Sequence, residues 1–527
     1  MHQAETVVLL FAAIAALVLI ARKIDVPYPI VLVLAGLGLS FVPHLPEVKL
    51  NPEIVFYFFL PPLIYPAALF TSWRDFRRNL RPILLLAIGL VLFTTIAIAS
   101  VAHTLIPALP WAAAFALGAI VSPPDAVAAT SVIRRLSVPH RIQTILEGES
   151  LVNDATALVA LQFAVAALMS GSFSISHAAL RFVSVAAGGI AFGLIVGFAM
   201  RWVQRHLDDP PVQITISLLT PFAAYLPAER LHVSGVLATA AAGIYLGWHS
   251  PLIVRARYRL QAFAFWEMVV FLLNGFVFIT IGLQLPGILR ALQGESLTSL
   301  IKDAFLVSAA VVFVRIGWVF AATYLPRLLS RRLRARDPMP PWQTVAIVAW
   351  AGMRGVVSLA AAFALPLVLS DGSAFPGRNY ILFLTFCVIL TTLVFQGLTL
   401  PILIRKLRVK DDGSTDEEER SARLEANKAA LELIKNLSAN GDFSPDTVDR
   451  LRAEYDERVQ QLELCAESPD DCRGEIATPQ YQRLQQEALN TERQTIIRLR
   501  NQHVINDEAL RRIQRDLDLA EARLTGM

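Results

Sequence analysis

Four acidic side chains interrupt otherwise apolar sequence in the first third of the chain. Asp125 lies in AIVSPPDAVAATSV, and Glu147, Glu149 and Asp154 lie in ILEGESLVNDATALVAL. A carboxylate in the middle of a bilayer costs roughly 2.5–3.5 kcal/mol or more, so carboxylates at such positions mostly handle ions or protons or pair with a buried cation. These residues therefore predict an ion transporter.

Helical spacing groups the polar residues of the second stretch. Glu147, Ser150 and Asp154 stand at i, i+3 and i+7 on one helix face, while Glu149 and Asn153 share an adjacent face at i and i+4. Hard cations bind several oxygen atoms at once. The Asp154 carboxylate, the Ser150 hydroxyl and an amide oxygen are therefore candidate ligands for a cation such as Na⁺.

A double proline supplies further ligands. Pro123 and Pro124 remove two backbone donors directly before Asp125, so the helix should break there and leave carbonyls such as that of Pro124 unpaired. The segment WAGMRGVVSLAAAFALP places glycines on both sides of Arg354 and forms a corresponding weak point. Two interrupted helices in matching positions of two halves indicate an inverted-repeat transporter.

Two arginines are predicted to lie deep among these helices. We expect Arg354 to pair with Glu149, and Arg315 to form a second, weaker pair with Glu147, which lies nearer the membrane surface. The two aspartates then have no fixed counter-ion. A site of this kind suits a proton and a metal cation that bind in alternation.

The composition places these residues in a membrane. The chain is 55% apolar and 17% charged, and its mean hydropathy is +0.52. Counting at 1.5 Å per residue brings both aspartates roughly to the middle of a hydrocarbon core about 30 Å thick. The apolar runs predict thirteen spanning helices, at 4–21, 27–43, 52–71, 82–106, 111–133, 141–170, 178–204, 212–226, 230–248, 262–285, 300–328, 342–369 and 379–404.

The distribution of Lys and Arg predicts the orientation. Loops after odd-numbered helices carry 23 of these residues and the other loops carry 6. Because Lys and Arg concentrate in cytoplasmic loops, the loops after odd-numbered helices are placed in the cytoplasm, the N-terminus outside and the C-terminus inside. Lys and Arg follow the first apolar run and do not precede it, so residues 4–21 are interpreted as a retained helix and not as a signal peptide.

The composition changes after residue 410. Residues 411–527 hold 26 acidic and 16 basic residues, and their apolar residues recur at helical spacing. We therefore expect a transmembrane domain over 1–410 and a soluble, charged, mostly helical cytoplasmic domain over 411–527. Cys387, Cys465 and Cys472 predict neither a structural disulfide in this reducing compartment nor a zinc site.

Other function classes fit these residues less well. The sequence contains no phosphate-binding GxxxxGK[ST] loop, so nothing in it indicates that ATP drives transport. No cofactor, enzymatic activity or nucleic-acid partner is predicted. An intramembrane aspartyl protease would also use two aspartates, but its GxGD element is absent. A passive cation channel and a proton-coupled carrier of organic substrates remain alternatives.

The motifs resemble one known family. LPPLIYPAALF, SPPDAVA, EGESLVNDA, NGFVFITIGLQLP and AGMRGVVSLAAAFALP are similar to segments of the monovalent cation:proton antiporters of the CPA1 type, the bacterial sodium/proton antiporters related to animal sodium/proton exchangers. The resemblance covers essentially all of residues 1–410. It implies a homodimer in the bacterial inner membrane, with a dimerisation domain and a core domain in which the helices at 111–133 and 342–369 cross, and a role in pH homeostasis.

The resemblance also implies a role for each site residue. Asp154 corresponds to the essential aspartate that binds cation and proton, and the Asn153-Asp154 pair goes with electroneutral one-for-one exchange. The further positions that match are the second aspartate Asp125, the serine ligand Ser150 and the stabilising ion pair Glu149 with Arg354. Na⁺ is then expected at Asp154, Asp125 and Ser150.

Two positions depart from the commonest pattern of this family. Pro124 stands where many relatives have threonine, so only its backbone carbonyl is available as a ligand, and Pro66 stands where some relatives have glutamate. These departures leave the choice among Na⁺, K⁺ and Li⁺ open, with a K⁺-selective proton antiporter of the same fold as an alternative.

Overall fold

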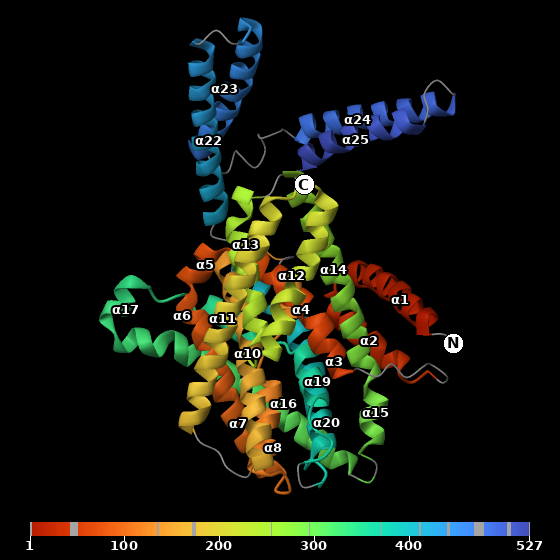
Figure 1. Cartoon of the computed structure of the whole chain (residues 1–527), viewed down its shortest axis with the longest axis vertical. Coiled ribbons are helices and arrows are strands. Elements are labelled where there is room, and N and C mark those ends of the chain that lie inside the picture. Colours follow the sequence, from red (N-terminus) through yellow and green to blue (C-terminus); the bar gives the residue numbers. More distant parts are fainter. Residues whose placement is uncertain are drawn as a thin grey trace. The chain divides into compact units, whose positions relative to one another are not determined.

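A computed structural model of the chain describes most of its residues and divides them into two compact units, Met1–Asp411 and Asp412–Met527. The described residues are 3–42, 51–133, 136, 138–170, 175–253, 256–292, 294, 296–369, 372–409, 413–439, 443–467, 479–502 and 507–525. Within them the secondary structure is helical apart from one isolated bridge between Val368 and Ala374. Figure 1 shows both units.

The helices of unit 1 follow the predicted apolar segments in order. They are α1 (Gln3–Lys23), α2 (Tyr28–Leu39), α3 (Pro52–Ile54), η1 (Val55–Phe59), α4 (Leu60–Leu69), α5 (Trp73–Arg78), α6 (Leu80–Leu84), η2 (Leu85–Leu90), α7 (Val91–Leu105), α8 (Trp111–Val121), α9 (Ala126–Ile133), α10 (His140–Ser170), α11 (Ile175–Arg205), α12 (Pro210–Arg230), α13 (Gly235–Ile253), α14 (Ala256–Leu283), α15 (Leu285–Arg290), α16 (Leu297–Leu329), α17 (Arg331–Arg336), α18 (Trp342–Trp350), α19 (Val356–Phe363), α20 (Arg378–Thr391), η3 (Thr392–Gln396) and α21 (Gly397–Leu407), where η marks a π-helical turn.

Many of these segments are long enough to span a membrane. Within the part of the chain that the structure describes, eight helical segments are long and apolar enough to cross a membrane. The segments outside these eight include α18 and α19, which are short because the apolar segment 342–369 is interrupted. The helical fold is therefore as predicted, while the number of thirteen spans stays a prediction.

The helix α10 is packed against several others in unit 1. It contacts α7, α8, α9 and α13, and the largest group of buried apolar residues surrounds this assembly. The helices α7 and α8 approach closely at Gly118, where a side chain would collide with the backbone of Thr95. Small residues allow helix backbones to approach closely in a membrane. This close approach fixes α8, whose C-terminal end leads into the predicted site.

Unit 2 contains two helical hairpins. In one, α22 (Ser414–Ala439) packs on α23 (Pro445–Glu467), and Lys428 Nζ lies 2.8 Å from Glu463 Oε1. In the other, α24 (Pro479–Asn501) packs on α25 (Asp507–Thr525), and Arg493 bonds Asp518 and Glu521 across the pair. Apolar residues spaced along α24 and α25 form the small core of that hairpin, as amphipathic patterning predicts: Leu489, Ile496, Leu510 and Leu517.

Cysteine chemistry can be assigned at one of the three positions. Cys387 is a free thiol within α20. The side chains of Cys465 and Cys472 lie outside the described residues, so the expectation for them stays a prediction.

Candidate functional site

The first predicted helix break is present at the double proline. The helix α8 ends at Val121 and α9 begins at Ala126, and the connecting residues include Pro123, Pro124 and Asp125. Asp125 takes the position before the first turn of α9, where its Oδ1 accepts a hydrogen bond from the Val127 amide at 2.8 Å. A carboxylate at this position also interacts favourably with the positive end of the helix dipole.

The second predicted break is present in the AGMRG segment. The helix α18 ends at Trp350 and α19 begins at Val356. The Asp125 amide donates a hydrogen bond to the Met353 carbonyl at 2.6 Å, so the two interruptions lie side by side. A side chain at Gly355 would collide with Asp125 Oδ2, which explains the glycine at this position. The two breaks therefore form one region of irregular backbone, which a membrane protein tolerates only inside protein or beside a cavity.

The helix α10 brings its polar residues to this region. Asn153 Nδ2 donates to the Pro124 carbonyl at 2.8 Å, and the Ser150 hydroxyl lies 3.4 Å from the Ala126 amide. Asn153 Oδ1 is buried and has no hydrogen-bond partner among the described residues. The structure thus brings Asp125, Ser150 and Asn153 together, and leaves one amide oxygen available for a ligand.

Asp154 is the unpaired carboxylate of this group. It has no hydrogen-bond or ion-pair partner among the residues that the structure describes, and its charge interacts with that of Asp125. Asp154, Asp125 and Ser150 each keep part of their surface exposed, whereas Asn153 and Glu149 are fully buried. The three groups that are predicted to bind Na⁺ through their side chains thus remain partly accessible.

Glu149 pairs with a different arginine from the one predicted. Its carboxylate receives two hydrogen bonds from Arg315, at 2.6 and 3.0 Å, and the two side chains are 1% and 0% exposed. Arg315 also donates to the carbonyls of Val348 and Ala351 at the C-terminal end of α18. The predicted pairing of Glu149 with Arg354 is therefore wrong, because α16 places Arg315 between α10 and the end of α18.

Arg354 serves the broken helices instead of a carboxylate. Its Nε donates to the carbonyl of Val121, the last residue of α8, at 3.0 Å, and its Nη1 donates to the Gly352 carbonyl. Its backbone amide donates to the Thr392 hydroxyl at 3.1 Å. A guanidinium at a helix C-terminus satisfies carbonyls that have no partner within the helix. Glu147 accepts a hydrogen bond from Gln143 at 2.8 Å, and its predicted pairing with Arg315 is also wrong, because Arg315 binds Glu149.

Comparison with known proteins shows to which family the chain belongs. Residues 8–406 match the family described as sodium/hydrogen exchanger, transmembrane. The chain belongs to that family. It is 37% identical over 524 residues to an uncharacterised Na⁺/H⁺ exchanger of Mycobacterium tuberculosis, covering 98% of this chain and 95% of the relative. It is 34% identical over 447 residues to the sodium, potassium, lithium and rubidium/H⁺ antiporter of Bacillus subtilis, covering 83% and 66%.

Solved structures agree on the fold. The sodium proton antiporter MjNhaP1 of Methanocaldococcus jannaschii matches with a TM-score of 0.60 at 20% identity, over 77% of this chain and 98% of that one. At this identity the match shows the exchanger fold alone. The family match over residues 8–406 and the relatives above confirm the predicted membership of the sodium/proton antiporter family.

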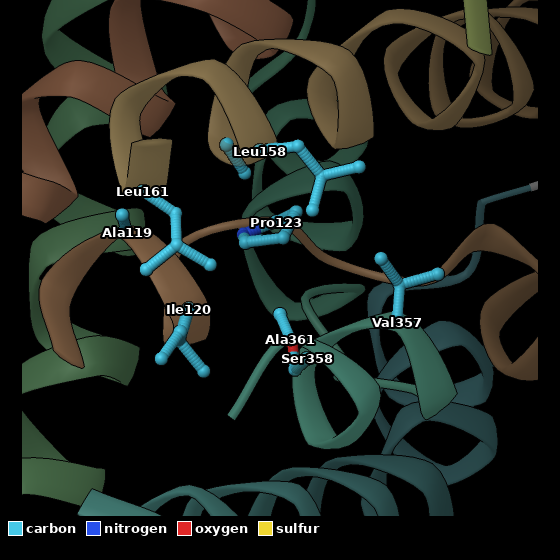
Figure 2. Close-up of a pocket in the computed structure, with 9 residues that line it drawn as sticks. Ala119, Ile120, Pro123, Leu158, Leu161, Val357, Ser358 and Ala361 are labelled. Carbon is cyan, nitrogen blue, oxygen red and sulfur yellow. The ribbon is translucent and has the colours of Figure 1, made fainter. Parts of the chain in front are cut away.

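A small cavity adjoins the exchanger site. It lies between α8, α10 and α19 with a cavity volume of about 10 Å³, and its walls are almost entirely apolar, with Pro123, Leu158 and Val357 among them (Figure 2). Ser358 contributes the hydroxyl, which is buried and has no partner among the described residues. One hydroxyl among apolar walls cannot replace the hydration shell of a cation. The cation ligands are therefore to be sought at Asp125 and Asp154, and not in this cavity.

Two residues of the site were not anticipated from the sequence. Thr392 stands in the π-helical turn η3 and fixes the backbone at Arg354, and Ser358 follows the second break. π-helical turns often occur at functional sites, but a threonine or serine in an apolar helix gives no sequence signal by itself. Only the packing of α19 and α20 on the breaks distinguishes them.

Proposed function

We propose that this protein exchanges Na⁺ for H⁺ across the bacterial inner membrane, with cation and proton competing for Asp154 and Asp125. The observation that carries the proposal is the unpaired, partly exposed carboxylate of Asp154 beside the junction of two interrupted helices. A carboxylate at such depth is costly unless a proton or a cation neutralises it. The membership in the sodium/hydrogen exchanger family supports the same chemistry.

The oxygen atoms around Asp154 suit a monovalent cation. The ligands that we propose are the carboxylates of Asp154 and Asp125, the Ser150 hydroxyl, Asn153 Oδ1 and the Pro124 carbonyl. Pro124 uses one carbonyl lone pair to accept from the Asn153 amide and keeps a second for a cation. Na⁺, K⁺ and Li⁺ all accept such ligands, and the Bacillus subtilis relative is named for four alkali cations.

The corrected ion pair supports one-for-one exchange. Glu149 and Arg315 neutralise one another, so the remaining fixed charges at the breaks are Arg354 and the two aspartates. The negative end of α8 and the positive end of α9 offset each other at the same break. The empty site then carries one net negative charge. One cation or one proton neutralises it, and both loaded forms cross the membrane without charge.

Exchange follows from a simple exclusion rule. The core crosses when a cation or a proton neutralises the site, and not when the site is empty and charged. In this proposal the transmembrane helices form a homodimer with the helices of the two breaks crossed, the N-terminus lies outside, and the tail, residues 411–527, lies in the cytoplasm.

Transport in proteoliposomes tests the proposal. Asp154→Asn removes the titrating group and keeps its volume, so cation-driven proton movement should fall at least 100-fold. Asp303→Asn is the matched control, because Asp303 is a buried aspartate outside the site that accepts a hydrogen bond from Tyr380 at 2.6 Å. Wild-type exchange by Asp154→Asn would refute the assignment, as would equal losses in both variants.

A second arm of this experiment addresses stoichiometry. An imposed membrane potential should leave the exchange rate of the wild-type protein nearly unchanged, because each loaded form is neutral. Clear acceleration by voltage would overturn one-for-one exchange, while ion flow that follows voltage without any proton movement would indicate a channel.

A further inference from the structure

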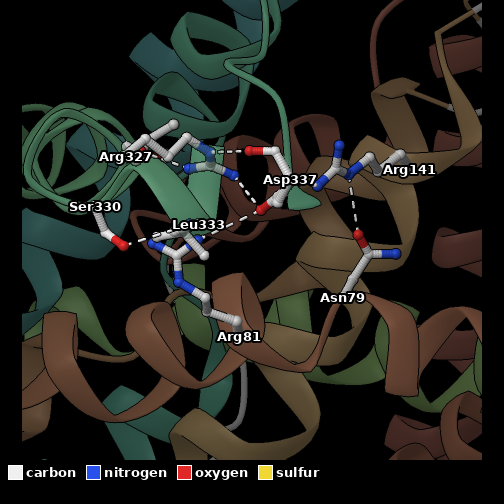
Figure 3. Close-up of polar contacts among 8 residues, drawn as sticks. Asn79, Arg81, Arg141, Arg327, Ser330, Leu333 and Asp337 are labelled. Carbon is white, nitrogen blue, oxygen red and sulfur yellow. Dashed lines mark hydrogen bonds and ion pairs between the residues drawn. The ribbon is translucent and has the colours of Figure 1, made fainter. Parts of the chain in front are cut away.

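A cluster of arginines gathers around one carboxylate at the ends of four segments of unit 1. Asp337 Oδ2 lies 2.5 Å from Arg327 Nη2 and 3.4 Å from Arg81 Nη1, and Asp337 Oδ1 lies 3.2 Å from Arg141 Nη2 (Figure 3). Three guanidinium groups thus share a single acid. The Asp337 cluster, made of these four residues, keeps an excess of two positive charges.

One guanidinium of the Asp337 cluster has an unused donor. Arg81 Nη2 is buried and has no hydrogen-bond partner among the described residues. Arg141 uses its Nε on Asn79 Oδ1, and Arg327 uses its Nε and Nη1 on the carbonyls of Asp337 and Thr323. An unsatisfied buried guanidinium N–H is costly, so this position favours an additional anionic acceptor.

The short helix α17 adds positive charge beside the Asp337 cluster. Arg331, Arg332 and Arg334 are exposed, and none of them has an ion-pair partner within the described part of the chain. Arg331 and Arg334 are three residues apart and share one face of α17. The sequence connects them directly to Arg327 on one side and Asp337 on the other.

Exposed apolar side chains nearby indicate how deep these arginines lie in the membrane. Leu328 and Leu329 are 62% and 80% exposed at the end of α16, one residue before α17, and Trp342 is 56% exposed at the start of α18. Leucines on a spanning helix face hydrocarbon, and tryptophan is enriched at the membrane interface. Arg331 lies two residues from Leu329 across the extended residue Ser330, so at most about 7 Å of chain separates them. The arginines therefore stand at the level of the lipid head groups.

We propose that α17 and the Asp337 cluster together bind the phosphate head groups of anionic phospholipids. Guanidinium groups bind phosphate oxygens in a bidentate geometry, and clusters of arginine beside a spanning helix attract anionic lipids. Because Leu328 and Leu329 face hydrocarbon, the groups beside the neighbouring arginines are lipid head groups, which an acidic soluble partner would have to displace. The site does not depend on the ion-exchange mechanism proposed for Asp154.

Lipid titration of the purified full chain tests the proposal. We expect phosphatidylglycerol to raise the thermal unfolding midpoint more than phosphatidylcholine does. Arg331→Gln with Arg334→Gln should weaken the apparent affinity for phosphatidylglycerol roughly 30-fold, since each arginine at the surface contributes about a factor of five. Arg331→Lys with Arg334→Lys keeps the charge and should restore most of the binding.

A control variant tests whether the lipid binds at α17 or to positive charge anywhere on the protein. Lys435→Gln with Arg450→Gln removes two exposed positive charges from unit 2 and should leave phosphatidylglycerol binding unchanged. Three outcomes would overturn the proposal: equal shifts with both lipids, equal loss in the unit 2 control, or full reproduction of the shift by inorganic phosphate at the same concentration.

Discussion

The buried pair of Glu149 and Arg315 makes the sharpest energetic prediction. Both side chains are almost completely inaccessible, and their contacts of 2.6 and 3.0 Å form a bidentate bridge. Two charges about 4 Å apart interact with roughly 4 kcal/mol at an effective dielectric constant of 20. Removal of one partner of a buried pair costs about 3–5 kcal/mol, because the other charge stays buried without compensation.

A double-mutant cycle measures this coupling. Glu149→Gln and Arg315→Met should each lower the thermal unfolding midpoint of the full chain in detergent by on the order of 5–10 °C. The double variant should lose much less than the sum, because it leaves no unpaired charge. A coupling energy of about 3–4 kcal/mol is therefore expected between these two positions.

The same cycle with Arg354 provides the control and the refutation. Glu149→Gln with Arg354→Met should be closer to additive, since Arg354 bonds carbonyls of the broken helices and not this carboxylate. Additivity for Arg315 together with strong coupling for Arg354 would contradict the pairing described above. It would also reinstate the pairing expected from the sequence.

Two further substitutions probe the junction of the breaks. Gly355→Ala places a methyl group against Asp125 Oδ2 and should lower exchange rates in proteoliposomes at least tenfold. The control, Gly317→Ala in α16, meets open space and should exchange like the wild-type protein. Equal rates in both variants would contradict the contact. Asn153→Asp adds a second uncompensated negative charge, so one bound cation no longer neutralises the site. The exchange rate should then become sensitive to an imposed membrane potential. A rate that stays independent of voltage would count against the charge assignment.

Local chemistry explains what could be predicted from the sequence. Pro123 and Pro124 cannot donate backbone hydrogen bonds, so a break before Asp125 follows from residue types alone. Helical spacing likewise places Ser150, Asn153 and Asp154 on neighbouring faces of α10. The apolar runs locate the helices within a few residues, although they do not settle how many of them span the membrane.

The partners of the two arginines could not be predicted in this way. The sequence shows that Glu149, Arg315 and Arg354 lie in apolar helices, but the choice of partner depends on how α10, α16 and α18 are rotated against one another. Counting carboxylates alone also overlooks the carbonyls that a break releases. Arg354 binds such carbonyls where the sequence suggested an acid.

The interrupted helices and the arginines thus depend on one another. A break provides the site with free backbone groups, but it also exposes carbonyls at the ends of α8 and α18 that must be satisfied inside the membrane. Arg354 satisfies the end of α8 and Arg315 the end of α18, while only Arg315 has an acid of its own. In the proposed mechanism the charge of Arg354 balances one of the two aspartates. In that proposal the number of ions exchanged depends on an arginine that is not itself a cation ligand.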